Sequence, residues 1–168
     1  MALSNGSWRH MDQVIGAQAI AESSTTQLHP LGTIIRAVDV GTTAYGMGEF
    51  VYLKGVASTA VGSWVTYNLD DGTTALLAAN AIGPVGIAMS ANAAATSYGW
   101  YQIGGKAIGA CLTGFADNGK VYITATAGSI DDASVAGDLV VNAKGASAID
   151  TLMAEFEIAR PFVADVFP

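Results

Sequence analysis

Hydrophobic residues after Leu31 come in short runs that Gly, Asn and Asp separate at intervals of roughly ten to fifteen residues. The run over 48–55 alternates Phe50 and Tyr52 with Val51 and Leu53, which is typical of a strand. Asp-Asn-Gly at 117–119 indicates a hairpin turn. The pattern predicts about nine short strands, over 33–40, 48–55, 63–68, 85–89, 98–104, 106–112, 120–126, 137–141 and 154–160.

These strands predict a mainly β fold, a single β-barrel or β-sandwich-like domain. Helices are limited to two short candidates, over 11–22 and 74–81. No helical pattern alternates with the strands, which disfavours a doubly wound α/β sheet with a nucleotide crevice.

The first 30 residues differ from the rest because they are polar, contain both histidines and end at His29-Pro30. Proline favours an extended conformation in the residue before it. We therefore predict an N-terminal arm over 1–30 and a β domain over 31–168. Apolar arm residues are costly to leave in water, and a β domain that is complete from Leu31 offers them no obvious partner. A disordered tail is the alternative, but we expect docking on another chain, either a partner protein or a neighbouring copy, through Trp8, Met11, Val14, Ile15 and Ile20.

The composition of the chain favours association with another protein subunit. The 168 residues suit one domain, and 51% of them are hydrophobic while only 12% are charged. Large neutral surfaces on such a chain usually meet another subunit. The formal net charge is −7, and the seven Lys and Arg are scattered, so direct nucleic-acid binding is disfavoured.

Residues that carry chemistry are few. The two histidines, His10 and His29, have no cysteine partner nearby, so zinc is not expected, and Cys111 is most simply a small buried hydrophobe. The pairs 70–71 and 131–132 are acidic but lack the spacing of a calcium loop, which favours ordinary turns. Neither a nucleophile elbow nor a complete phosphate loop is present. We expect no enzyme activity, metal or cofactor.

Signals for a membrane or for secretion are weak. The segment 72–105 has no charged residue, but its apolarity is mostly alanine and is interrupted by Asn80 and Gly83-Pro84. The N-terminus lacks a basic region followed by an apolar core. We expect synthesis in the cytoplasm and no association with a membrane.

Four aromatic residues lie in strand-like runs and are candidates for the core or for an interface. Side chains alternate along a strand, so Tyr98 and Trp100 should share one face and Tyr101 the other. A sugar-stacking platform is the functional alternative for these side chains. The four candidates are Trp64, Tyr98, Trp100 and Tyr101.

The segment 81–89, Ala-Ile-Gly-Pro-Val-Gly-Ile-Ala-Met, leads through the Ala-rich stretch 90–97 into Tyr-Gly-Trp-Tyr-Gln-Ile-Gly-Gly at 98–105. Over residues 28–125 this pattern resembles the capsid decoration, or cement, proteins of tailed bacteriophages. The long polar arm departs from the smallest members.

The resemblance implies a small, mostly β homotrimer that binds the outer surface of the major capsid protein lattice and stabilises the head. It also implies a place on the capsid exterior of the virion after synthesis in the host cytoplasm. The alternative function is a phage fibre, tail or baseplate β module that recognises host glycan through Tyr98 and Trp100.

Overall fold

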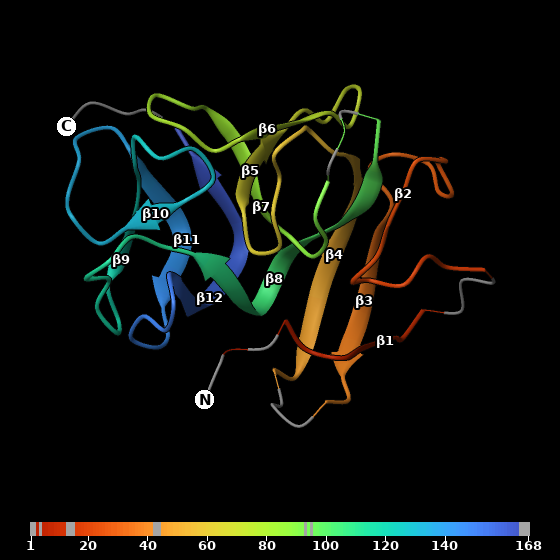
Figure 1. Cartoon of the computed structure of the whole chain (residues 1–168), viewed down its shortest axis with the longest axis horizontal. Helices are drawn as coiled ribbons and strands as arrows, with labels where there is room; N and C mark the ends of the chain where they lie inside the picture. The colour runs from red at the N-terminus through yellow and green to blue at the C-terminus, as the bar shows by residue number, and fades with distance from the viewer. Residues whose placement is uncertain are drawn as a thin grey trace.

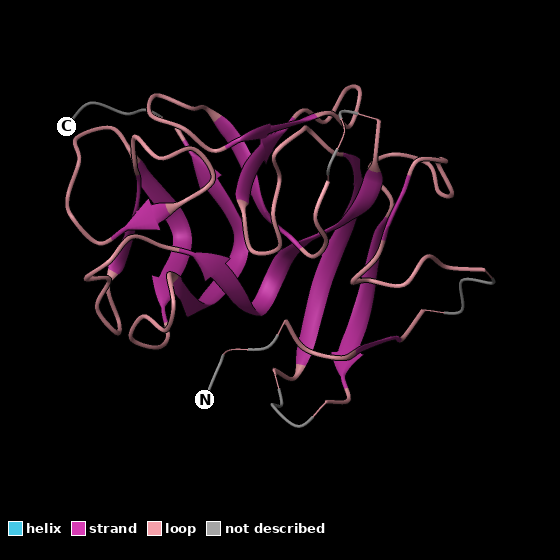
Figure 2. Cartoon of the chain, viewed as in Figure 1, coloured by secondary structure: helices cyan, strands magenta, loops and turns pink. Residues whose placement is uncertain are grey.

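The fold consists of strands and connecting turns. The computed structural model of the chain describes residues 3, 5–12, 16–41, 45–92, 94 and 96–164. Strands make up 49% of the residues, and the described residues contain no helix (Figure 2). The strands form one antiparallel sheet of 12 strands that does not close on itself as a barrel would. The prediction of a mainly β fold is confirmed.

Twelve strands replace the nine expected because four very short strands were not predicted, and because the runs 98–104 and 106–112 form one long strand. The strands are β1 (Trp8–His10), β2 (Ser23–Ser24), β3 (Ile34–Asp39), β4 (Met47–Lys54), β5 (Trp64–Tyr67), β6 (Thr74–Leu76), β7 (Gly83–Ala88), β8 (Tyr98–Ala110), β9 (Lys120–Ile123), β10 (Ile130–Asp131), β11 (Leu139–Gly145) and β12 (Met153–Val163).

Both predicted helices are wrong for the described residues. The range 74–81 begins with β6, whose Thr74, Ala75 and Leu76 pair with β5. In the range 11–22, the described residues form turns and irregular backbone, and Gly16 has a φ of +73°, outside the helical region. Pairing with neighbouring strands therefore overrides the weak helical spacing of apolar residues.

Strand β8 holds the two sides of the sheet together. Its first half, Tyr98–Gly104, pairs with β4, and its second half, 104–110, pairs with β12. Figure 1 shows β3 and β4 on one side of the molecule, β9–β12 on the other, and β8 running between them. The strand order along the sheet is β1-β3-β4-β8-β7-β12-β11-β9-β10, with β5 and β6 joined through β7.

Glycine permits the change of partner within β8. Gly105 has a φ of +95°, and a Cβ atom at this position would collide with the backbone oxygen of Met47. A residue with a side chain resists such a φ, so only glycine fits this close approach without strain. A register shift in β4 between Glu49 and Phe50 lies at the same corner.

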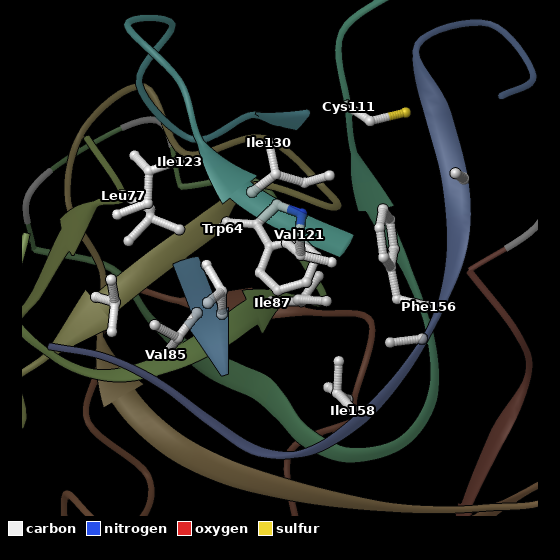
Figure 3. Packing of buried hydrophobic residues seen from close by; sticks show 14 of the residues in the cluster. Trp64, Leu77, Val85, Ile87, Cys111, Val121, Ile123, Ile130, Phe156 and Ile158 are labelled. Carbon is white, nitrogen blue, oxygen red and sulfur yellow. The ribbon is translucent and has the colours of Figure 1, made fainter. Parts of the chain in front are cut away.

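The hydrophobic core has three parts, and β8 contributes to all of them. The largest part, the Trp64 cluster, fills the side of the molecule with β9–β12 and includes Ile87, Val121, Phe156 and Ile158 (Figure 3). The Trp100 cluster contains Ile20, Ile35, Ala37, Phe50, Tyr52, Met89 and Trp100. The Tyr101 cluster contains Val51, Leu53, Val65, Ala88, Tyr101 and Ile103.

Residues 1–30 contact the β domain of their own chain. Strand β1 pairs with β3, and β2 pairs with the start of β8. Ile20 is 2% exposed within the Trp100 cluster, and the Trp8 ring packs edge-on against Phe50, with 4.9 Å between ring centroids. Trp8 and Ile20 therefore do find partners in their own chain, contrary to the expectation. The division at residue 30 stays a prediction.

Candidate interaction surface

A row of apolar side chains, exposed on β11 and β12 and half-buried on β7, crosses three neighbouring strands on the outward side of the sheet. Val141 of β11 lies opposite Phe162 of β12, and Phe162 lies opposite Pro84 of β7. Directly opposed residues in an antiparallel pair point to the same face. Val141 and Phe162 are 41% and 40% exposed, while the alternate residues Val140 and Val163 are buried in the Trp64 cluster. The row is therefore a water-facing apolar surface opposite the core.

A groove of about 530 Å³ adjoins this row at Pro84. It lies between the β5–β6 hairpin and the start of β7. Its lining combines the apolar side chains of Tyr67, Leu69 and Ile82 with polar residues, namely Thr66, Asn68, Asp70, Thr73 and Thr74. Leu69 and Ile82 are among the most exposed large apolar side chains of the described residues. Together, the row and the groove make up the apolar face, formed by Tyr67, Leu69, Ile82, Pro84, Val141 and Phe162.

Asp70 lines the groove of the apolar face, and charges of both signs lie near it. Arg160, two residues before Phe162, forms an ion pair with Glu49 at 3.2 Å. Burial raises the pKa of Tyr67, and the nearby positive charge of Arg160 acts in the opposite direction. Asp71 accepts hydrogen bonds from the backbone N–H and the hydroxyl of Thr73, which lower the pKa of its carboxyl and fix the β5–β6 turn. The face suits contact with another protein surface better than contact with a highly charged polymer.

Phe162 was not anticipated because the predicted last strand ended at Pro161. β12 continues through this proline. The pairing of β11 with β12 shifts register between Val141 and Ala143, and Asn142 and Arg160 both have positive φ there. A bulge is one of the places where a sheet tolerates proline, since a ladder hydrogen bond is missing there anyway.

The four candidate aromatic residues lie mostly in the core. Trp64, Trp100 and Tyr101 are almost completely buried, and Tyr98 is half-buried against the Trp100 cluster. The Trp100 indole Nε1 donates a hydrogen bond to the backbone oxygen of Gln18. Trp100 therefore presents no exposed ring on which a sugar could stack.

The arm residues do not gather into one docking surface. Trp8 is half-buried and Ile20 fully buried against their own chain, whereas Met11 is 56% exposed. Val14 and Ile15 lie outside the described residues. Of the described members of this set, Met11 alone projects substantially into solvent.

Asp39 fastens the N-terminal segment to the end of β3. Its carboxylate accepts hydrogen bonds from the backbone N–H groups of Ser7, Gly41 and Tyr45, at 2.8, 2.9 and 3.0 Å. Burial opposes ionisation of this carboxyl, but the three backbone donors outweigh it and lower its pKa. A group with a lowered pKa stabilises the fold above its ordinary value of 3.8, and that contribution disappears as the pH falls through the folded-state pKa.

We therefore expect Asp39→Ala to lower the free energy of unfolding by about 2 kcal/mol at pH 7, because three backbone donors lose their acceptor. Urea unfolding at pH 7 and at pH 3 measures the effect, and the difference between the variant and the wild type should shrink at the lower pH. Asp131→Ala is the control, since the Asp131 side chain accepts one hydrogen bond, from the adjacent Asp132 N–H. Equal losses at both pH values would contradict the assigned role of the ionised carboxylate.

Cys111 lies in the Trp64 cluster and is 1% exposed (Figure 3). Burial, followed by the charges of Asp131 and Asp132, raises the pKa of its thiol from 9.0 to about 11. Thiolate is the reactive form, so we expect iodoacetamide to alkylate the native chain at pH 8 at least about 100-fold more slowly than the urea-unfolded chain. Mass spectrometry of the alkylated fraction over time measures this ratio, and similar rates in both states would show that the thiol is accessible.

The described ranges, 3, 5–12, 16–41, 45–92, 94 and 96–164, bring few chemistry-bearing side chains together. No group of three or more His, Cys, Asp or Glu in those ranges is placed to hold a metal ion. In the same part of the chain, no helix has the length and apolarity needed to cross a bilayer. Comparisons with protein-family models, with curated proteins and with solved structures give no match.

Proposed function

We propose that the chain is a structural virion protein, a capsid decoration protein that binds the outer surface of the major capsid protein lattice and stabilises the head as a homotrimer. The apolar face is the observation that carries this proposal. It combines the exposed row at Val141 and Phe162 with the adjoining groove, on a chain in which only 12% of residues are charged. The sequence pattern over 81–105 supports the assignment by its resemblance to such proteins.

The apolar face has a suitable form for contact with the capsid. Pro84, Val141 and Phe162 lie on paired strands, so these side chains are held in place before binding and little conformational entropy is lost, whereas Leu69 and Ile82 lie in the connections beside them. Contiguous exposed apolar surface on a soluble protein usually marks an interaction site. A trimer carries three such faces, so modest affinity at each becomes strong attachment to a repeating lattice.

A sandwich-like packing is part of this proposal. Strands β4 and β8 bury side chains on both of their faces, in the Trp100 cluster on one and the Tyr101 cluster on the other. Such a body has a rigid interior and leaves its outer strands free for contact. The alternative role in glycan recognition has less support, because Trp100 is buried.

Two measurements test the proposal. Light scattering coupled to size-exclusion chromatography should give the mass of a trimer, and cosedimentation with heads of the encoding phage assembled without this protein should show saturable binding. We expect Phe162→Ser to reduce that binding at least tenfold, which corresponds to about 1.4 kcal/mol.

Leu28→Ser is the matched control, because Leu28 is a large apolar residue that is even more exposed than Phe162, at 52% against 40%, and lies in the N-terminal segment outside the apolar face. It should bind as the wild type does. A monomer that fails to bind such heads would overturn the proposed function, and equal losses in the two variants would remove the apolar face as its site.

A further inference from the structure

Gln18 fastens the N-terminal segment 16–29 to strands β4 and β8. Its side-chain oxygen accepts a hydrogen bond from the Tyr52 hydroxyl at 2.8 Å, and its backbone oxygen accepts one from Trp100 Nε1 at 2.9 Å. Its side-chain nitrogen donates to the backbone oxygens of Glu22 and Tyr98. Because Gln18 is buried, loss of these hydrogen bonds would leave its polar groups and those of its partners with neither a protein partner nor water.

His29, at the other end of the segment 16–29, forms a further hydrogen bond with Gln18. The backbone N–H of Gln18 donates a hydrogen bond to His29 Nε2 at 3.1 Å. An imidazole nitrogen can accept a hydrogen bond only when it carries no proton, so this contact requires neutral His29. The ring is 8% exposed and lies against Tyr52 and Trp100, with centroid distances of 4.9 and 5.3 Å.

The surroundings of His29 disfavour a positive charge. Burial lowers its pKa from the ordinary 6.5, and the second histidine, His10 on β1, lowers it further. Neither ring nitrogen of His10 has a hydrogen-bond partner among the described residues. From β4 and β8 the titratable groups near His29 are the phenols of Tyr52 and Tyr98, whose rings stack on each other.

The other charged groups of these elements point elsewhere. The side chains of Arg9 on β1, Arg36 on β3 and Glu22 on the segment are exposed. Asp12, in the turn after β1, accepts a hydrogen bond from the backbone N–H of Arg36. No carboxylate therefore contacts the His29 ring in the described part of the chain, and a proton on the ring would add a positive charge there without compensation.

We propose that His29 is an acid-sensitive latch whose protonation releases the segment 16–29 from β4 and β8 while the Trp64 cluster stays folded. The direction follows from the geometry. Docking of the segment is complete at pH values where His29 is neutral, above about 6.5, and is lost as the pH falls below that value. Release uncovers the Tyr52 and Trp100 side chains, which Ile20 and Gln18 cover in the docked state.

The test uses the full chain and hydrogen exchange of backbone amides read by mass spectrometry, between about pH 8 and pH 5, with exchange times corrected for the intrinsic effect of pH. We expect the protection of peptides from residues 16–29 to fall at least tenfold over this range. Peptides from β9 and β12, which line the Trp64 cluster, should keep their protection.

Two histidine variants identify the responsible group. His29→Gln places an amide oxygen that can accept the Gln18 N–H and cannot titrate, so its segment should stay protected at pH 5. His10→Gln is the matched control, and it should keep the transition, because the His29 imidazole that accepts the Gln18 N–H is still present. A transition that persists in His29→Gln, or one that His10→Gln abolishes, would overturn the proposal.

The wild type provides a further check that does not depend on a variant. Deuterium exchange at the imidazole C2 position reports the titration of each histidine, and its midpoint for His29 should coincide with the midpoint of segment release. A wild-type segment that stays protected at pH 5, or midpoints that differ by more than about one pH unit, would exclude the latch. Capsid binding is not used in this experiment, so its result is independent of the proposed function.

Discussion

Trp64→Ala should lower the free energy of unfolding by about 3 to 5 kcal/mol, the range found for large aromatic residues truncated in a core. The Trp64 side chain is fully buried at the centre of its cluster and packs edge-on against Phe156, with 5.0 Å between ring centroids (Figure 3). Its indole Nε1 has no hydrogen-bond partner among the described residues, so the loss comes from packing alone. Domains of this kind are stable by about 5 to 15 kcal/mol, so the variant is expected to be close to unfolding.

Urea unfolding followed by circular dichroism measures this loss, and Trp8→Ala is the control. Trp8 is the same residue type but is only half-buried, at the border of the Trp100 cluster. Truncation of Trp8 should lower the free energy of unfolding by no more than about half as much, because folding buries less apolar surface of this side chain. Equal losses in the two variants would show that Trp64 is not the centre of the core.

Gly105→Ala is expected to destabilise the chain by about 3 kcal/mol. An alanine with positive φ costs about 1 to 2 kcal/mol, and overpacking adds a similar amount. The collision here is with the backbone oxygen of Met47, which cannot rotate away as a side chain would. Thermal unfolding, together with hydrogen exchange of β4 and β8, would locate the damage at the corner where β8 changes partner.

Gly104→Ala is the neighbouring control. A Cβ at Gly104 would lie 3.3 Å from the Cβ of Glu49, and no positive φ is required there. We expect a loss below about 1 kcal/mol. If the alanine at 104 were as harmful as the alanine at 105, the backbone conformation of Gly105 would not be the cause.

The sequence predicted the strands well where alternation is clear. The range 33–40 contains β3, and the range 48–55 covers all of β4 except Met47. The expected separation of Tyr98 and Trp100 from Tyr101 agrees with their places in two different clusters. Such local alternation depends only on which side of a strand each residue faces.

Features that depend on distant parts of the chain were not predictable in this way. Gly104-Gly105 suggested a break between two strands, but β8 continues through it because β4 and β12 supply partners on either side. β12 passes Pro161 because the proline lies within a bulge of β12, where residues 159–161 face the single residue Asn142 of β11. The apolar face was missed for the same reason, since Val141, Phe162 and Pro84 become neighbours only through strand pairing.

The sharing of β8 also bears on how the chain folds during synthesis. Residues near Gln18 leave the ribosome well before their partner Trp100, which is 82 positions later, and β12, the partner of the second half of β8, is made only after β9, β10 and β11. A fold dominated by such distant pairings is expected to form slowly. Until β12 is available, β8 has an unpaired edge that can pair with other nascent chains, so a chaperone that covers that edge should raise the yield of native protein.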